Sequence, residues 1–310
     1  MKVKLIPGLS SQSQTKQRDA YIGCVSHYDY DKIEPLVRSL ELSGFTGDKI
    51  MIAWTLGGDV IKRLQNKGWN IIIPDSRANL NPNGDMHSPV HPARIVVERF
   101  DALYRLLAGW EDRPDWRYII TTDVKDVIFQ RNPSDWLDEN FNAMSPIHVG
   151  SECLAYKDEP WGNDNMQKSF PLEYERMRDR IIYNCGTITA TPDYLKGLAF
   201  SIYNLCQLSR IHNPDQAALN VLLSMAPWCD VTSFNSMQSG YAVQLGTVND
   251  PNKLESFRPF LTEHKLPYLG EDGIVRVSHN DGENKIIPMM VHQYDRNPKW
   301  KQIIEAKYKE

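Results

Sequence analysis

The sequence predicts an α/β fold in which a doubly wound, mostly parallel sheet is flanked by helices and followed by a smaller, β-rich C-terminal portion. Two observations predict it: buried-strand patterns alternate with helical patterns early in the 310 residues, and short apolar runs alternate with turns in the last third. The chain has no internal repeat and no Gly/Ser-rich linker. We therefore expect a flexible arm over residues 1–18 and a single domain over residues 19–310.

The first elements follow in order from the hydrophobic pattern. A helix is expected over residues 33–40, and a second helical stretch ends at residues 67–68. Residues 75–91, which are rich in Asn, Pro, Gly and His, are expected to form a long loop. Buried strands are predicted at the short apolar runs of residues 21–25, 49–54 and 69–73.

The middle of the chain begins with helical periodicity over residues 93–107, which leads into an apolar run at residues 116–122. A turn and a helix N-cap are expected at residues 132–135, and a short strand at residues 147–150. Residues 155–180 are dense in charged, aromatic and Asn residues and have little periodicity, which indicates an excursion from the sheet.

The remaining elements make up the β-rich portion and the helices before it. A strand is expected at residues 185–189, and helices are expected at residues 192–208 and 214–225, the first with Pro at an early helical position. Short strands separated by turns are then predicted at residues 241–244, 274–277 and 286–291.

Composition and motifs argue against several classes of protein. With 35 basic and 39 acidic residues, a net charge of −4 and no basic run, the chain is not expected to bind nucleic acid. It has no apolar run long enough for a membrane span and no signal-peptide pattern, so we expect a soluble, cytoplasmic protein. The five cysteines are odd in number and far apart, which favours buried free thiols. P-loop, dinucleotide-binding and nucleophile-elbow motifs are absent from the sequence.

Two carboxylates, Asp123 and Asp126, follow the apolar run of residues 116–122. Acids at the carboxyl end of a buried strand are placed where α/β proteins bind ligands, and hard divalent cations prefer oxygen ligands. The alternative is structural: Asp123 caps the turn and Asp126 pairs with Lys125 or a nearby Arg. The spacing alone is common and leaves both interpretations open.

Three further groups of polar residues lie at the ends of predicted elements. Asn184 and Gly186 stand at the entry of a strand, Asp215 and Gln216 begin a helix, and His292 follows an apolar run. The helix dipole is a sufficient structural reason for an acid at position 215. A neutral imidazole at position 292 is suited to complete a carboxylate metal site.

Other candidates are more isolated. Arg94 and Arg99 lie on the predicted helix before the apolar run of residues 116–122. A guanidinium group can bind phosphate, although most helix arginines face solvent. His27 and Tyr28 follow the first strand, where a base or ribose can bind. Glu152 follows another predicted strand and is either an acid–base residue or a solvated surface group.

Taken in order, these groups resemble the nucleotide-sugar glycosyltransferases of the A-type (GT-A) fold, and most of all the group that includes glycogenin and the bacterial lipopolysaccharide galactosyltransferases. The likeness covers residues 20–300. The runs at residues 122–130 and 291–296 also resemble a set of poorly characterised bacterial and viral glycosyltransferases. The motifs that carry the likeness are Ala93-Arg94, the strand ending at Asp123, Asn184-Cys185-Gly186, Asp215-Gln216, and His292 with the following Pro298 and Trp300.

The resemblance implies an enzyme that transfers a sugar from a nucleoside diphosphate donor, expected to be a UDP-sugar, to a sugar or glycoconjugate acceptor. It implies a nucleotide-binding half over residues 19–130 and an acceptor and catalytic half over residues 131–310. It also implies Mn²⁺ or Mg²⁺ held against the donor diphosphate by Asp123, a second acid and His292, acting as a Lewis acid on the leaving group.

The same resemblance gives the candidate residues their roles. Asn184 and Asp215 would orient the donor sugar, Gln216 would lie beside its anomeric carbon, and Arg94 would bind the donor. The expected donor-binding residues are His27, Tyr28, Arg94, Arg99, Thr122, Lys125, Asn184 and Gly186. The expected catalytic residues are Gln216, Asp215 and Glu152, and the expected metal ligands are Asp123, Asp126 and His292.

One departure from the family pattern concerns the metal. The family has Asp-x-Asp, whereas Lys125 stands in the place of the second acid and Asp126 comes one position later. Either Asp126 binds the metal after a rearranged turn, or Lys125 supplies the positive charge that the leaving diphosphate needs. Of these two interpretations, we favour the metal.

Two other functions stay open from the sequence. A nucleotidyltransferase also places acids at strand ends, but it normally carries a Gly-rich basic segment after the first strand, which residues 23–28 lack. A nucleotide-sugar-binding or carbohydrate-binding protein of the same fold, without turnover, is the second alternative. Lys125 in place of an acid is the feature that favours it.

Overall fold

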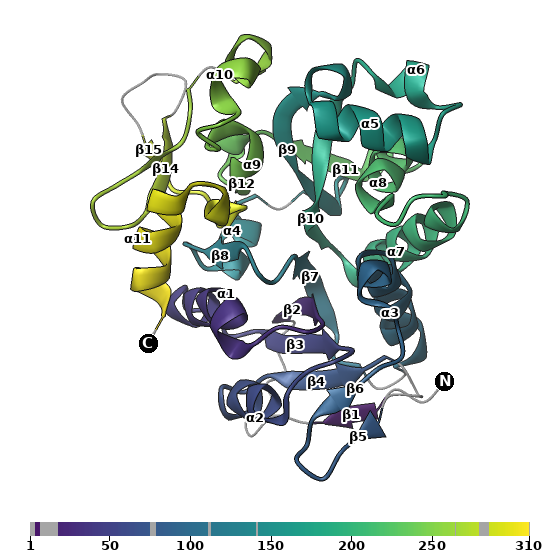
Figure 1. The fold of residues 1–310 in the computed structure, drawn as a ribbon, viewed down its shortest axis with the longest axis vertical. Helices are drawn as coiled ribbons and strands as arrows, with labels where there is room; N and C mark the ends of the chain where they lie inside the picture. Colours follow the sequence, from purple (N-terminus) through teal and green to yellow (C-terminus); the bar gives the residue numbers. More distant parts are fainter. Residues whose placement is uncertain are drawn as a thin grey trace.

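The computed structural model has an eight-stranded mixed sheet with helices on both faces (Figure 1). It describes residues 4–6, 18–74, 79–110, 113–140, 142–263, 265–278 and 285–309. The strand order is β1-β4-β3-β2-β7-β10-β9-β11. These strands are β1 (Lys4–Ile6), β2 (Arg18–Val25), β3 (Asp48–Ala53), β4 (Asn70–Ile73), β7 (Trp116–Thr122), β9 (Ile147–Ala155), β10 (Ile181–Ala190) and β11 (Thr232–Asn235).

The first half of the sheet is built from parallel βαβ units. Strands β4, β3, β2 and β7 pair in parallel, and the chain crosses between them through helices. These helices are α1 (Tyr30–Leu42), α2 (Gly58–Asn66) and α3 (Ile95–Gly109). Strand β10 then runs antiparallel to both β7 and β9, while β11 is parallel to β9. The predicted α/β class with a mostly parallel central sheet is therefore confirmed.

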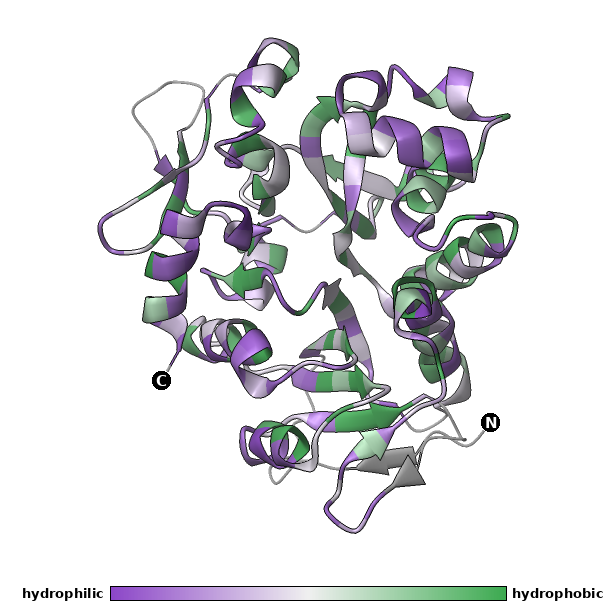
Figure 2. Ribbon diagram, viewed as in Figure 1, coloured by the Kyte–Doolittle hydropathy of each residue, from purple (hydrophilic) through white to green (hydrophobic). Residues whose placement is uncertain are grey.

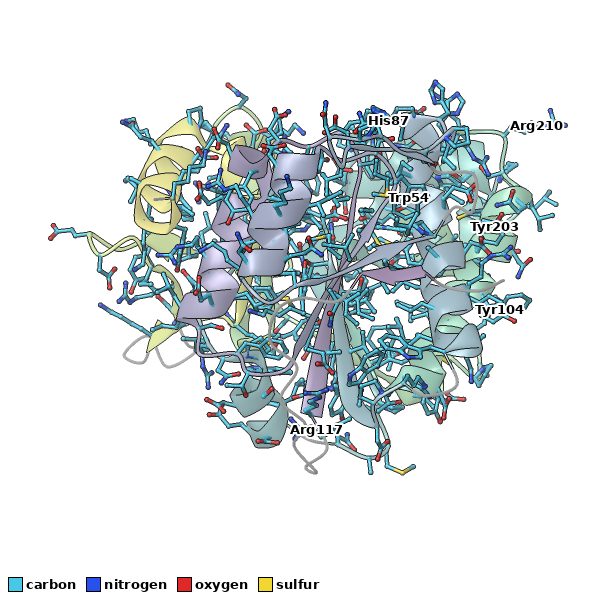
Figure 3. The ribbon with its side chains drawn as sticks, turned by 90° about the horizontal axis from the view of Figure 1, so that it is seen from below. Trp54, His87, Tyr104, Arg117, Tyr203 and Arg210 are labelled. Atoms are coloured by element: carbon cyan, nitrogen blue, oxygen red, sulfur yellow. The ribbon has the colours of Figure 1, made fainter. Side chains whose placement is uncertain are left out.

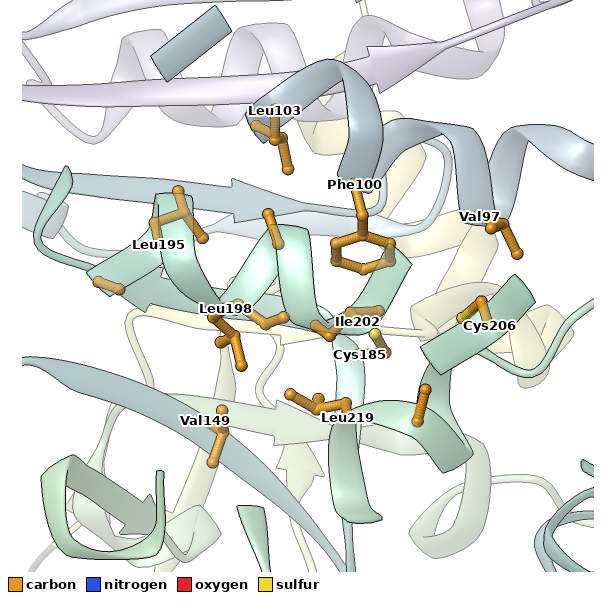
Figure 4. Packing of buried hydrophobic residues seen from close by; sticks show 14 of the residues in the cluster. Val97, Phe100, Leu103, Val149, Cys185, Leu195, Leu198, Ile202, Cys206 and Leu219 are labelled. Atoms are coloured by element: carbon orange, nitrogen blue, oxygen red, sulfur yellow. The ribbon is translucent and has the colours of Figure 1, made fainter. Parts of the chain in front are cut away.

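The core has two layers because successive side chains of a buried strand point to opposite faces of the sheet. On strand β2, Tyr21 and Val25 pack with α1 and α2, whereas Ala20 and Ile22 pack toward α3. The second core layer, on the α3 side of the sheet, also contains α7 (Pro192–Gln207) and α8 (Asp215–Leu223). Figure 4 shows Val97 and Phe100 of α3 close to Ile202 and Cys206 of α7. Apolar colour is concentrated on the central strands in Figure 2.

The C-terminal part adds small sheets and a third apolar cluster, which includes Ile128, Val243 and Val291. One sheet joins β12 (Ala242–Gln244), β16 (Met290–His292) and β8 (Val127–Phe129) in that order. The other is antiparallel, with strands β13 (Tyr268–Leu269), β14 (Val275–Ser278) and β15 (Lys285–Ile286). Strand β16, near the end of the domain, pairs with β8, which follows β7 and the two acids Asp123 and Asp126.

The remaining elements are short or lie at the periphery. The helices are α4 (Pro133–Glu139), α5 (Pro160–Ser169), α6 (Tyr174–Met177), α9 (Leu245–Val248), α10 (Leu254–Phe257) and α11 (Pro298–Tyr308). The 3₁₀ turns are η1 (Pro92–Arg94), η2 (Tyr156–Asp158), η3 (Cys229–Val231), η4 (Met237–Ser239), η5 (Arg258–Phe260) and η6 (Tyr294–Arg296). In the described part of the chain, no helix has the length and apolar character needed to cross a membrane. All five cysteines are free.

Several boundaries differ from those predicted. The flexible arm over residues 1–18 lies mostly outside the described residues, but Lys4–Ile6 pairs with β4 and Arg18 begins β2. The loop of residues 75–91 contains the hairpin β5 (Asn79–Leu80) and β6 (Met86–His87), while residues 75–78 lie outside the described part. The predicted strand over residues 286–291 is divided between β15 and β16.

The excursion expected over residues 155–180 is helical. Helix α5 has Pro160 at its first turn, and the Glu159 side chain accepts hydrogen bonds from the backbone of Trp161 and Gly162, which is a favourable start for a helix. Met166 and Met177 are buried in the second core layer. Two methionines in a polar segment give a weak periodic signal, so the pattern alone did not indicate these helices.

Ion pairs hold the amino-terminal ends of the central strands. The Arg117 guanidinium of β7 binds the buried Asp19 carboxylate of β2, with an Nη2–Oδ2 distance of 2.6 Å, and also pairs with Asp138. Figure 3 shows Arg117 at one end of the sheet and His87 at the opposite end. This leaves the carboxyl ends of β2 and β7 free for the site described below.

We predict that His148 makes the protein less stable in acid. Its ring is 2% exposed, packs against Trp136 and Tyr241, and neither nitrogen has a hydrogen-bond partner in the described protein. Burial lowers its pKa from 6.5 to about 4. The unfolded chain therefore takes up this proton first, so stability is complete above pH 6.5 and falls toward pH 4.

The linked loss is about 3 kcal/mol of unfolding free energy at most. Urea unfolding at pH 7.5 and pH 4.5 measures it: His148→Phe should lose less free energy on acidification than the parent. His212→Asn, at an exposed position, should behave like the parent. Equal losses in the parent and His148→Phe would show that another group causes the acid sensitivity.

Candidate active site and metal centre

Two adjoining clefts open at the carboxyl ends of β2 and β7. Cleft A, of about 470 Å³, contains His27, Tyr28, Lys125 and Asp126 on its walls. Cleft B, of about 420 Å³, contains Glu152, Trp161, Asn184, Gly186, Asp215, Gln216, Lys253 and His292. Both clefts are lined by Val96, Arg99, Asp123 and Arg296. The two clefts therefore meet beside Asp123.

Residues 123–126, called the acidic turn below, join β7 to β8. The backbone N–H of Asp123 donates to the carbonyl of Gly186 at 2.9 Å, which ties the turn to β10. Strand β8 then pairs with β16, and Val127 lies opposite His292. As a result, ligand atoms of Asp123, Asp126 and His292 all lie within 4.8 Å of one another. Residues far apart in the chain thus form one compact group.

This group suits a divalent cation. Nε2 of His292 lies 3.5 Å from a carboxylate oxygen of Asp123 and 3.5 Å from one of Asp126, which is longer than a charge-assisted hydrogen bond. The same nitrogen is buried and has no hydrogen-bond partner in the described protein. Two carboxylates and one imidazole are ligands that Mn²⁺ accepts, and Mg²⁺ also binds through carboxylates and substrate phosphates.

Two carboxylates, those of Asp123 and Asp126, make the surroundings of His292 negatively charged. Burial by itself lowers the pKa of His292, but the carboxylates of Asp126 and Asp123 outweigh it and raise the pKa to about 10. The group therefore attracts a positive charge into the space between the ring and the two acids. A divalent cation that displaces this proton would meet the same attraction.

Arg99 connects the acidic turn to helix α8. Its side chain is only 12% exposed, and it pairs with Asp123 and, at 2.9 Å, with Asp215. It also donates to the carbonyl of Cys185 at 3.3 Å. Burial tends to raise the pKa of Asp123, but Arg99 and His292 hold it well below its usual range. Burial raises the pKa of Asp215 despite the same guanidinium group.

A polar network lines the inner wall of cleft B. The Asn184 side chain donates to Glu152 at 2.6 Å and accepts from the backbone N–H of Gly186 at 2.6 Å. Oε1 of Gln216 accepts from the N–H of Cys185 at 3.4 Å. Burial raises the pKa of Glu152 to about 7, which suits a residue that exchanges protons near neutrality.

Two of these residues were expected at strand ends and lie inside strands instead. Glu152 is within β9 and Asn184 is within β10. The register between β10 and β9 shifts between Tyr183 and Ile188, so the ladder is irregular at the site. Such irregularities redirect side chains, which explains how mid-strand residues reach the cleft.

Lys125 and Asp126, the two residues whose roles the sequence left open, lie in different surroundings. Asp126 belongs to the Asp123–Asp126–His292 group, whereas Lys125 lines cleft A and pairs with Asp295 at 3.3 Å. His27 and Tyr28 line the same cleft, as expected. His27 has a φ of 60°, and its backbone N–H donates to the Thr55 carbonyl at 2.7 Å. This strained backbone lies at the cleft wall.

Two expected donor-binding residues are not brought to the clefts. Arg94 pairs with Glu98 and donates to Gln207, each at 3.3 Å, and it is not among the lining residues. Thr122 is 3% exposed, and its hydroxyl bonds to that of Tyr21 at 2.8 Å. Each side chain is bound by partners outside the clefts, and Arg99, five residues after Arg94, reaches the site instead.

The sequence did not single out several lining residues. Trp161 is 50% exposed at the start of α5, and Lys253 precedes α10 on another wall of cleft B. Arg296 pairs with Asp126 at 3.5 Å, and it lies in the run of residues 291–296 that carries part of the resemblance, so it had a signal. Glu159, Gly246 and Thr247 also line cleft B and had no signal in the sequence.

Comparison of the sequence with known proteins adds no assignment. No protein-family model matches the chain, and no curated protein matches it significantly.

We predict that Gly186→Ala disrupts the Asp-Asp-His group. A Cβ at this position would lie 2.7 Å from Oδ2 of Asp123 and 2.7 Å from Cε1 of His292. Both side chains must shift, so Mn²⁺ affinity measured by isothermal titration calorimetry should fall at least about tenfold, with a stability loss of about 1–3 kcal/mol.

Gly109→Ala is the matched control for this experiment. A Cβ at residue 109 meets no atom within 4 Å, and the residue ends helix α3, so this substitution should leave Mn²⁺ binding unchanged. Parent-like Mn²⁺ affinity in Gly186→Ala would mean that the metal does not bind between Asp123 and His292.

Proposed function

We propose that the protein is a metal-assisted glycosyltransferase of the GT-A type. It transfers a sugar from a nucleoside diphosphate donor, a UDP-sugar in the first instance, to a sugar or glycoconjugate acceptor. The observation that carries the proposal is the meeting of two clefts at the Asp123–Asp126–His292 group. A nucleotide-sugar has the matching layout, with a nucleoside and a sugar on either side of a diphosphate.

Cleft A suits the nucleoside and the diphosphate. It lies at the carboxyl end of β2, where open α/β sheets bind ligands, and its wall includes the rings of His27 and Tyr28. Lys125 and Arg296 supply positive charge in the same cleft, and such groups bind phosphate oxygens. Asp123, Asp126 and His292 would hold the cation next to them.

Cleft B suits the donor sugar and the acceptor. Asn184, Asp215 and Gln216 present amide and carboxylate groups that can hydrogen-bond to sugar hydroxyls. Glu152 is buried beside them, and its raised pKa of about 7 lets it accept the proton of an acceptor hydroxyl near neutral pH. Its Oε1 is already held by Asn184, which fixes the carboxylate in place.

The chemistry of transfer needs the negative charge of the leaving diphosphate to be neutralised. A bound Mn²⁺ or Mg²⁺ supplies this charge as a Lewis acid. Arg99 keeps Asp123 ionised and ready to bind a cation, and its second ion pair holds Asp215 on the opposite side. The protein's own contribution is therefore positioning and charge.

Donor turnover with and without metal tests the proposal. The purified protein is incubated with UDP-glucose, UDP-galactose and UDP-N-acetyl sugars, with Mn²⁺, Mg²⁺ or EDTA, and UDP release is measured with and without simple glycoside acceptors. We expect release that depends on Mn²⁺ and increases with a suitable acceptor. Binding of donors without any turnover would favour the non-catalytic alternative, and pyrophosphate release from a nucleoside triphosphate would favour a nucleotidyltransferase.

We predict that Asp123→Asn abolishes donor turnover and keeps the fold. The amide loses the charge that binds a cation, and kcat should fall at least about 100-fold, since even losing a group that orients a metal ligand costs about 10- to 100-fold. Asp164→Asn, an exposed acid on α5 that pairs with Lys168, serves as the control and should keep the parent rate. A parent-like rate in Asp123→Asn would contradict the assignment.

We predict that Trp161 contributes to acceptor binding. Its half-exposed indole lines cleft B, and aromatic faces pack well on the apolar faces of sugars. Trp161→Ala should raise the acceptor KM about tenfold, which is about 1.4 kcal/mol, without changing UDP release in the absence of acceptor. Trp161→Phe keeps a ring and should recover most of the affinity. Equal acceptor KM values in all three proteins would exclude this role.

A further inference from the structure

Gln244 contacts the one ring nitrogen of His292 that faces away from the two carboxylates. It is the last residue of β12, and it lies opposite His292, the last residue of β16, in a parallel ladder. Both side chains are 2% exposed. Oε1 of Gln244 lies 2.7 Å from Nδ1 of His292, which is the distance of a short hydrogen bond.

The amide of Gln244 is itself held from a third strand. Its Nε2 donates to the hydroxyl of Thr187 on β10 at 2.7 Å, and Thr187 is completely buried. A Cβ on Gly150 would come within 2.7 Å of the same nitrogen, so the glycine leaves room for the amide. Three strands thus fix the plane and position of this side chain.

The arrangement decides which tautomer of His292 is favoured. With the Gln244 oxygen accepting from Nδ1–H, Nε2 is left with either its lone pair or a second proton, directed at Asp123 and Asp126. The remaining tautomer, with hydrogen on Nε2 alone, would leave two acceptors facing each other at Nδ1. Metal ligands are commonly oriented by such a hydrogen bond on the opposite ring nitrogen.

We infer that Gln244 is a positioning residue that holds His292 with its Nε2 lone pair toward the cation. The inference rests on the proposed metal group and adds a consequence for metal choice. Imidazole ligands favour transition metals, whereas Mg²⁺ favours oxygen ligands. An oriented His292 therefore directs the group toward Mn²⁺ over Mg²⁺.

Direct metal binding to the whole protein, without donor or acceptor, tests the inference. Mn²⁺ and Mg²⁺ affinities are measured by calorimetry for the parent and for Gln244→Leu, Gln244→Glu and Thr187→Val. Gln244→Leu removes the acceptor and should weaken Mn²⁺ binding about 10- to 100-fold, with a smaller effect on Mg²⁺. Gln244→Glu keeps an acceptor for Nδ1–H and should stay within a few-fold of the parent. Thr187→Val should give an intermediate loss.

Nitrogen NMR of the His292 ring supplies a second readout that a purely structural role would not move. In the protein with diamagnetic Mg²⁺, we expect hydrogen on Nδ1 alone in the parent and a larger fraction of doubly protonated rings in Gln244→Leu at the same Mg²⁺ concentration. Thermal unfolding shows whether each variant folds, and the conservative Thr187→Val keeps the test open if Gln244→Leu does not.

The outcomes separate the two claims. If the parent binds no Mn²⁺, the metal group and this inference are both wrong, while metal-independent transfer would still be detected by UDP release. If the parent binds Mn²⁺ and His292→Ala does not, but Gln244→Leu and Thr187→Val match the parent, only the role of Gln244 is overturned. Reversed selectivity with hydrogen on Nε2 would also overturn it.

Discussion

The candidate site depends on one buried guanidinium group shared between two carboxylates. Arg99 on α3 pairs with Asp123 at the end of β7 and with Asp215 at the start of α8. Arg99 and Asp215 are largely buried, and the cost of removing their charges from water is offset only when the charges face each other and their remaining hydrogen bonds are made. This contact fixes the distance between the acidic turn and the first turn of α8. Cleft B takes its inner shape from that spacing.

The rest of the site is arranged around this contact by sheet pairing. Strand β10 carries Asn184 and Gly186 past the acidic turn, and the carbonyl of Gly186 accepts from the Asp123 backbone. Strand β16 brings His292 to the same turn through its pairing with β8. The main sheet and the small C-terminal sheet therefore meet at the Asp-Asp-His group, and Val127 and Met290 of the small sheet share an apolar cluster with Ile120 of β7.

Strong local patterns made most of the α/β elements predictable from the sequence. The buried strands β3 and β4 are short continuous apolar runs, and the helices α3 and α7 have apolar residues at helical spacing. Helix α5 was not predictable, because a polar segment with one buried methionine is decided by tertiary packing. The register shift in β10 was also hidden, so Asn184 was expected at a strand entry and not within a strand.

The candidate site was predictable where the pairing of strands brings the ends of apolar runs together. Asp123, Asp126 and His292 come together as expected from the strand-end argument. Arg94 had the expected position in the chain but is used by Glu98 and Gln207, which a linear pattern cannot reveal. Gln244 had no signal, because its importance comes from two hydrogen bonds to distant strands.

The pairing of β8 with β16 also links metal binding to the stability of the fold. Asp123 and Asp126 precede β8 and His292 ends β16, so a cation that binds all three joins two parts of the domain that are distant in sequence. An ion that binds only the assembled form stabilises that form by mass action. Binding of a metal at this group would then raise the free energy of unfolding of the domain by linking the central sheet to the C-terminal portion.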